Sequence, residues 1–219
     1  MVQLPNHIPV MVLPEATLFP GATYPMKVSQ ASHVKLVKDA LEMNRFFILA
    51  NEDTPESIPC PISGLGLIRA AIKVKGSYHL ILQGLARIYL EKRISAYPYD
   101  TYEISPLVES SGNAKVQESL AEQLKEKVVY VIKNMDVKTF GIVAKVSTTA
   151  QFKKKLANPL EDFLTYLKSV QQPGVLADLV ASTFIVPGKD RQALLDACSV
   201  SDRLRRAIKI FGKTYGLAD

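Results

Sequence analysis

Side chains that commonly carry catalysis are sparse and scattered in this sequence. His7, His33 and His79 fall in three separate segments, and none lies in a zinc-binding spacing. Cys60 and Cys198 are 138 positions apart, which favours two free thiols in a reducing cytoplasm. No serine occupies a G-x-S-x-G turn, although a Ser-Lys pair assembled in space stays open. We therefore expect a non-catalytic protein with no metal site and no cofactor.

Positive charge is a second feature with chemical consequences. The net charge is +6, and residues 107–219 hold 17 basic and 12 acidic side chains, a net of +5. The strongest run is Lys153-Lys154-Lys155, which is either a solvated helix end or a basic patch for nucleic acid or an acidic partner. Gly212-Lys-Thr214 resembles the end of a phosphate-binding loop, but Ala207 stands where the first glycine is required. ATP binding is not expected.

A third feature is the aromatic cluster Tyr97-Pro-Tyr99-Asp-Thr-Tyr102. Prolines and tyrosines at the entry to a strand often pack against each other locally. They also suit an apolar, wettable groove for an extended peptide, because tyrosine offers contact area at little cost in conformational entropy. Both interpretations remain open on the residues alone.

The elements that position these residues divide the chain in two. Ten of the 13 prolines lie at or before Pro106, which predicts strands and turns there rather than helices. A short helix is expected over 31–44, and strands are expected over 66–75, 78–83, 86–95 and 99–108. Closing these strands into a small barrel would remove their exposed edges.

The second half of the chain has the periodicity of amphipathic helices. Apolar residues step by three or four from Val116 to Met135, and a further helix is expected over 139–150. Asn158-Pro159 is a typical helix start, Pro173 opens another helix, and Ser199 caps the last one. With 219 residues, one large or two small domains are expected, and no run approaches the length of a membrane span.

The strand region contains several short motifs whose order and spacing can be compared with known families. Ile8-Pro-Val-Met-Val-Leu-Pro14 and Leu18-Phe-Pro-Gly21, followed by Pro25-Met26, resemble the opening of the N-terminal domain of Lon proteases. Gly84-Leu-Ala-Arg87 stands in the place of the family's G-x-x-R, and Pro98-Tyr99 in the place of its P-Y.

The helical half continues the resemblance. Pro173-Gly-Val-Leu-Ala-Asp-Leu-Val-Ala181 is close to the family's D-P-G-x-L-A-D-x-[IV]-A, with Gln172 where the family often has an acid or serine cap. Leu194-Leu195 and Asp202-Arg-Leu204 match a downstream segment. The resemblance implies an α+β fold. Residues 1–108 would form a PUA-like β pseudo-barrel with one short helix, and residues 109–219 a helical bundle.

The resemblance also implies a role in recognition, without the AAA+ ATPase and Ser-Lys protease modules of full-length Lon. We expect a cytoplasmic, non-catalytic module, either a stand-alone protein or a piece of a longer one. It would bind unfolded or exposed apolar protein segments, as an adaptor in proteolysis or quality control that works with a protease or chaperone. The candidate peptide-binding residues are apolar or aromatic: Leu18, Phe19, Tyr24, Met26, Tyr97 and Tyr99. For each of them, packing in the core is the competing interpretation.

RNA binding through the PUA-like domain is the alternative function. The nearly even charge of residues 1–106, ten basic against nine acidic side chains, counts against it.

Overall fold

The computed structural model describes residues 7–52, 58–110, 112–135, 139–140 and 159–217. The chain divides into two compact units, Met1–Leu107 and Val108–Asp219, which we call the β unit and the helical unit. The boundary predicted from the sequence falls one residue later.

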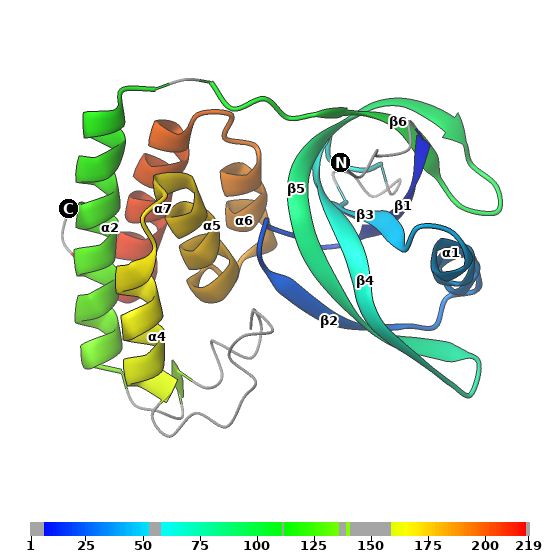
Figure 1. Cartoon of the computed structure of the whole chain (residues 1–219), viewed down its shortest axis with the longest axis horizontal. Coiled ribbons are helices and arrows are strands. Elements are labelled where there is room, and N and C mark those ends of the chain that lie inside the picture. The colour runs from blue at the N-terminus through cyan, green and yellow to red at the C-terminus, as the bar shows by residue number, and fades with distance from the viewer. Residues whose placement is uncertain (1–6, 53–57, 111, 136–138, 141–158, 218–219) are drawn as a thin grey trace. The chain divides into compact units, whose positions relative to one another are not determined.

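In its described part, the β unit consists of a six-stranded sheet and one helix (Figure 1). The elements are β1 (His7–Leu13), β2 (Thr23–Val28), α1 (Ala31–Glu42), β3 (Phe46–Asn51), β4 (Ile62–Val74), β5 (Ser77–Ser95) and β6 (Thr101–Pro106).

The sheet closes on itself. Its strand order is β2-β5-β4-β3-β1-β6, and β6 pairs with β5 as well as with β1. Neighbouring strands are antiparallel except for β1 and β3, which run parallel. Among the described strands, β2 pairs with β5 alone. It therefore lies outside the closed circuit and keeps one edge open.

One long strand replaces two predicted ones. The expectation of separate strands over 78–83 and 86–95 was wrong, because β5 runs without a break from Ser77 to Ser95. The register of β4 and β5 shifts between Leu65 and Gly66, which pairs with Gly84, so the irregularity is a bulge rather than a turn. The glycine signalled a local distortion, and the chain absorbs it within one strand.

One hydrophobic cluster of the β unit forms where α1 packs against the sheet. The helix buries Leu36, Val37 and Ala40, which belong to the same hydrophobic cluster as Leu80 and Leu82 of β5. These two strand residues alternate with the more exposed His79 and Ile81, as the period of two in the sequence predicts.

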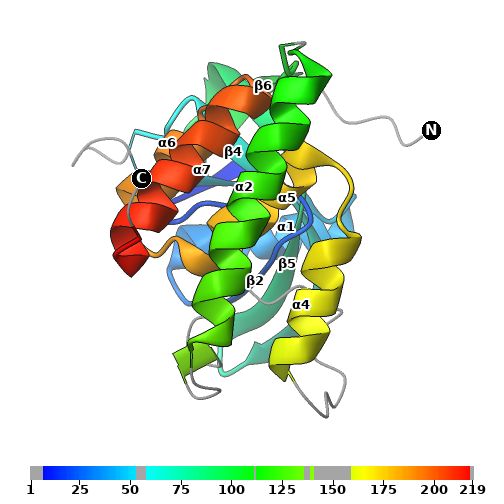
Figure 2. The same ribbon diagram turned by 90° about the vertical axis from the view of Figure 1, so that its left-hand side faces the viewer.

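The described part of the helical unit contains five helices: α2 (Ala114–Lys133), α4 (Pro159–Ser169), α5 (Pro173–Phe184), α6 (Gly188–Leu195) and α7 (Val200–Tyr215). α2, α4 and α7 face the viewer in Figure 2. Asn113 and Ser199 cap α2 and α7 with side-chain hydrogen bonds, whereas Gln172 makes none at α5. Edge-to-face contacts join Phe184 to Phe163 and Phe211 in the core.

The helix predicted over 139–150 lies outside the described residues except for Thr139 and Phe140. The predicted basic patch Lys153, Lys154 and Lys155 lies wholly outside them.

Candidate functional site: an apolar surface on three strands

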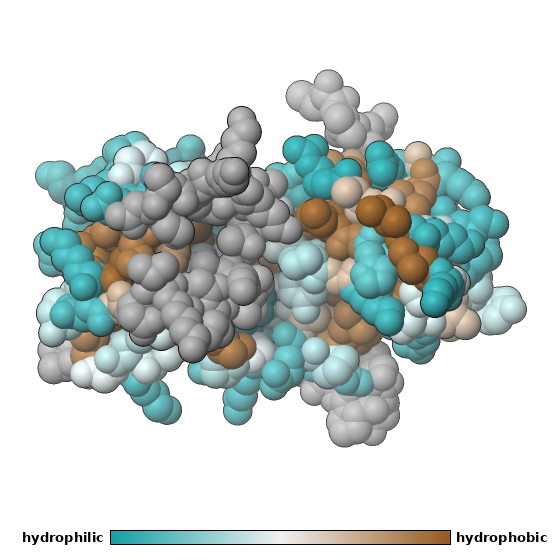
Figure 3. All heavy atoms as spheres, turned by 90° about the horizontal axis from the view of Figure 1, so that it is seen from below, coloured by the Kyte–Doolittle hydropathy of each residue, from teal (hydrophilic) through white to brown (hydrophobic). Residues whose placement is uncertain are grey.

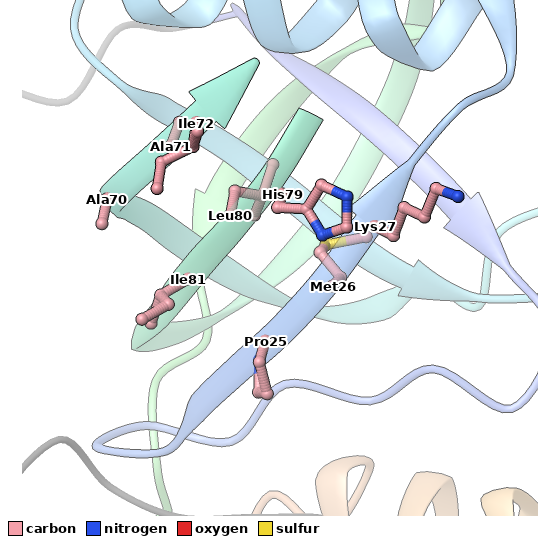
Figure 4. A pocket seen from close by; sticks show the side chains of 9 residues that line it. All are labelled: Pro25, Met26, Lys27, Ala70, Ala71, Ile72, His79, Leu80 and Ile81. Carbon is pink, nitrogen blue, oxygen red and sulfur yellow. The ribbon is translucent and has the colours of Figure 1, made fainter. Parts of the chain in front are cut away.

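The strongest candidate site lies on the outer face of β2, β5 and β4. The register places Lys27, His79 and Ile72 in one row across the three strands, and Pro25, Ile81 and Ala70 in another (Figure 4). Because side chains alternate along a strand, both rows point away from the core. We call Pro25, Ala70, Ile72 and Ile81 the apolar shelf.

The apolar shelf forms part of an open depression of about 410 Å³. The row between the two outer rows, Met26, Leu80 and Ala71, forms its floor and packs against the hydrophobic core. Ile72 is 67% exposed although it is fully apolar. In the space-filling view, hydrophobic side chains gather on the β unit with hydrophilic ones around them (Figure 3). A clustered patch of this kind is typical of a binding surface.

Of the candidate peptide-binding residues, Leu18 and Phe19 are core residues with 0% exposure. Their backbone passes close to two glycines. A Cβ on Gly64 would lie 2.2 Å from the Leu18 carbonyl oxygen, and a Cβ on Gly84 would lie 2.0 Å from the Phe19 carbonyl oxygen. This segment is therefore fixed beneath the surface, and neither side chain is available to a ligand.

Tyr24 and Met26 are half-buried and pack against the same core cluster. Met26 lines the depression, and Tyr24 is not among its lining residues.

Tyr97 and Tyr99 lie elsewhere, on either side of Pro98, which follows a cis peptide bond. Tyr97 is 87% exposed. Tyr99 lines a smaller polar depression of about 210 Å³ together with His33 and Asp100. The six candidates therefore do not form one groove.

The charges around Tyr99 are satisfied within the β unit. Its hydroxyl donates to Asp39 Oδ2 at 2.9 Å, and burial, followed by this carboxylate, raises the pKa of Tyr99 to about 12. A hydrogen bond from Lys35 lowers the pKa of Asp39. Asp100 forms an ion pair with Arg93, and burial lowers the pKa of His33. These contacts fix the loop that carries Tyr99, and they indicate a structural rather than a catalytic cluster.

A second set of sequence motifs meets inside the helical unit. Arg203 of α7 is 1% exposed, and its Nε lies 3.2 Å from Asp178 Oδ1 on α5. Its Nη2 donates to Glu109 Oε1 at 2.7 Å. A Cβ on Gly174 would lie 2.9 Å from Nη2, so the glycine makes room for the guanidinium group. The glycine, aspartate and arginine of these motifs thus meet at one place: Gly174 and Asp178 both lie next to the buried Arg203.

Sequence reasoning missed Ile72 and Lys27 as surface residues of the site. Alternation along residues 78–83 placed His79 and Ile81 on one face, but a single strand does not show which neighbours continue that face.

Within the described residues, neither a cluster of metal-binding side chains nor a membrane-spanning helix occurs. No group of three or more His, Cys, Asp and Glu side chains there could hold a metal ion. No helix in those ranges is long and apolar enough to cross a membrane.

Comparison with known proteins places this fold in a family. The chain belongs to the family described as the ATP-dependent protease La (LON) substrate-binding domain, whose profile matches residues 7–213. "Lon protease" of Desulfosudis oleivorans is 24% identical over 94% of the chain, and "Lon protease 2" of Sorangium cellulosum is 26% identical over 95%. The chain spans about a quarter of the length of these relatives, 24% and 25% respectively.

Solved structures agree on the fold. The N-terminal domain of Mycobacterium avium complex Lon protease superimposes with a TM-score of 0.72 at 13% identity, covering 94% of this chain and 98% of that one. A Lon N-terminal domain protein from Xanthomonas campestris gives a TM-score of 0.59 at 17% identity, covering 93% and 97%. The resemblance read from the sequence motifs is confirmed.

Proposed function

We propose that this chain binds exposed apolar or unfolded segments of other proteins, and that the apolar shelf is the contact surface. Membership of a substrate-binding domain family supports the proposal. The observation that carries it is the set of exposed apolar side chains that three neighbouring strands bring around one depression.

Binding would rest mainly on the burial of apolar side chains. An extended segment placed on the shelf would cover Ile72 and Ile81, at about 25 cal/mol for each Å² of apolar surface removed from water. Strand addition along the open edge of β2 is less favourable, because Pro25 offers no backbone N–H group there. Met26 would contribute from the floor of the depression.

The architecture that presents this surface is, we propose, a PUA-like pseudo-barrel, followed by a helical bundle. The closed circuit of β5, β4, β3, β1 and β6 supports the first assignment, and the packing of α2 against α4, α5 and α7 supports the second. Such a module would only recognise and hold the segment, and a protease or chaperone partner would act on it. This makes the chain a non-catalytic adaptor or protein-interaction domain in proteolysis or quality control.

The test is binding of a fluorescently labelled, permanently unfolded protein, measured by fluorescence anisotropy with the full chain. We expect a Kd of micromolar order, well below ~100 µM. Ile72→Ser should weaken binding by about five- to thirtyfold, because an apolar side chain that is buried on binding contributes roughly 1–2 kcal/mol.

Ile94→Ser is the matched control. Ile94 is on β5, is 47% exposed and does not line the depression, so its replacement should leave the Kd unchanged. Absence of binding at ~100 µM would exclude the function, since that limit corresponds to about −5.5 kcal/mol. If Ile72→Ser and Ile94→Ser weakened binding equally, the protein would still bind unfolded segments, but the apolar shelf would not be the contact surface. Competition by a single-stranded RNA would instead favour the nucleic-acid alternative.

A further inference from the structure

Basic side chains border the apolar shelf. Lys27 and His79 line the depression in the same cross-strand row as Ile72, and both are exposed. Arg69 is exposed at the register shift of β4, directly before Ala70 of the shelf. Of the nine lining residues, two carry a basic group and none carries a carboxylate.

β2 and β4 contain no acidic residue, and β5 contains one, Glu91, which lies beyond the residues that form the shelf. The sequence holds neither Asp nor Glu between Glu15 and Asp39, which includes β2. It holds none between Glu56 and Glu91, which includes β4 and most of β5. The nearly even charge of the β unit therefore hides a local asymmetry, and the shelf lies in its positive part.

Geometry brings a docked segment within reach of these charges. The row from Lys27 to Ile72 crosses two interstrand spacings, about 10 Å, and side chains on one face of an extended chain repeat about every 7 Å. A carboxylate two positions from an apolar side chain resting on Ile72 therefore approaches the flexible amine of Lys27. On the β4 side, the exposed Arg69 directly precedes Ala70 of the shelf, and we take it as the second basic partner.

We propose that the apolar shelf selects extended protein segments in which an acidic residue stands two positions from an apolar one. The inference rests on the proposed function and adds the substrate class. Apolar burial supplies attachment, and Lys27 and Arg69 supply the preference for acidic over neutral or basic neighbours. Exposed ion pairs of this kind are individually weak, so the expected preference is moderate.

The test uses three labelled peptides of equal length with valine or leucine at every fourth position, so that the residue two positions further on lies on the same face of the extended chain. These same-face positions carry serine in the first peptide, aspartate in the second and lysine in the third, and all other positions carry serine. At low salt the full chain should bind the aspartate peptide about three- to thirtyfold more tightly than the serine peptide. The difference should shrink as the salt concentration rises, because exposed charges are screened.

The double variant Lys27→Gln, Arg69→Gln should abolish the preference, so that the aspartate and serine peptides bind with Kd values within about twofold of each other, since the exposed charges that distinguish them are removed. The matched double variant Lys38→Gln, Lys92→Gln removes two exposed lysines of the same unit that do not line the depression, and should keep the preference.

Equal affinity for the aspartate and serine peptides, or a preference that survives in the first double variant, would overturn the inference and leave the proposed function standing. Failure of the serine peptide to bind would overturn both. A single-stranded oligonucleotide that displaces the aspartate peptide, and loses this ability in the Lys27 and Arg69 variant, would identify a phosphate-binding surface instead.

Discussion

At the scale of single residues, Arg203 is the largest fully buried side chain among the described residues. A guanidinium group at 1% exposure is stable only when carboxylates compensate its charge, and Asp178 and Glu109 lie within ion-pair distance of it. The three residues join α5, α7 and the segment before α2. Asp178 and Arg203 belong to two separate motifs in the sequence. The fold pairs them, because the carboxylate of Asp178 compensates the buried charge of Arg203.

Asp178→Ala should lower the free energy of unfolding of the chain by about 3 kcal/mol, because it leaves a buried guanidinium group with one fewer carboxylate. Urea denaturation measures the effect. Asp202→Ala is the control, since Asp202 pairs with Arg206 at the surface and its loss should cost less than about 1 kcal/mol. Equal, small losses in both variants would contradict a structural role for the buried pair.

At the scale of elements, two glycines determine how the β unit assembles. The Leu18–Phe19 segment crosses β4 at Gly64 and β5 at Gly84 with no space for a Cβ atom. Leu18 and Phe19 are fully buried at this crossing, which coincides with the bulge where Gly66 pairs with Gly84. The crossing leaves the outer face of the same strands to the apolar shelf.

Gly84→Ala should therefore destabilise the protein by about 2 kcal/mol or more, because the obstacle is backbone and cannot rotate away. Thermal and urea denaturation would report the loss. Gly212→Ala is the contrasting variant: the nearest atom lies 3.6 Å from its added Cβ, and alanine in a helix should be neutral or stabilising by up to about 1 kcal/mol. A Gly84→Ala variant as stable as the original protein would show that the Leu18–Phe19 segment can move away from β5.

Element types were largely predictable from local pattern, and their pairing was not. Helical periodicity and caps located α1, α5 and α7 within a few residues, since spacing and capping are local properties. The parallel pairing of β1 with β3 and the outer position of β2 depend on contacts between distant segments. The site was limited in the same way, because the apolar shelf draws single residues from three strands.

The predicted peptide-binding residues also show that contacts between distant segments cannot be predicted from local pattern. Leu18 and Phe19 are apolar and lie beside a turn, which is the composition of an exposed groove as well as of a core segment. The choice between the two depended on Gly64 and Gly84, whose role is visible only once the strands are paired.

At the scale of the whole molecule, the charge and the proposed function belong to different units. Most of the net positive charge lies in residues 107–219, while the apolar shelf lies in the β unit and has its own local excess of basic groups. Net charge alone would predict a binding surface in the helical half. The exposed apolar side chains instead favour a binding surface on β2, β4 and β5.

Hydrogen–deuterium exchange of the full chain, with and without a saturating unfolded protein, identifies the binding surface directly. Binding on the apolar shelf should slow amide exchange in Thr23–Val28 and in 70–81, and leave α5 and α7 unchanged. Protection confined to the helical unit, or no protection under conditions where anisotropy shows binding, would contradict the central claim.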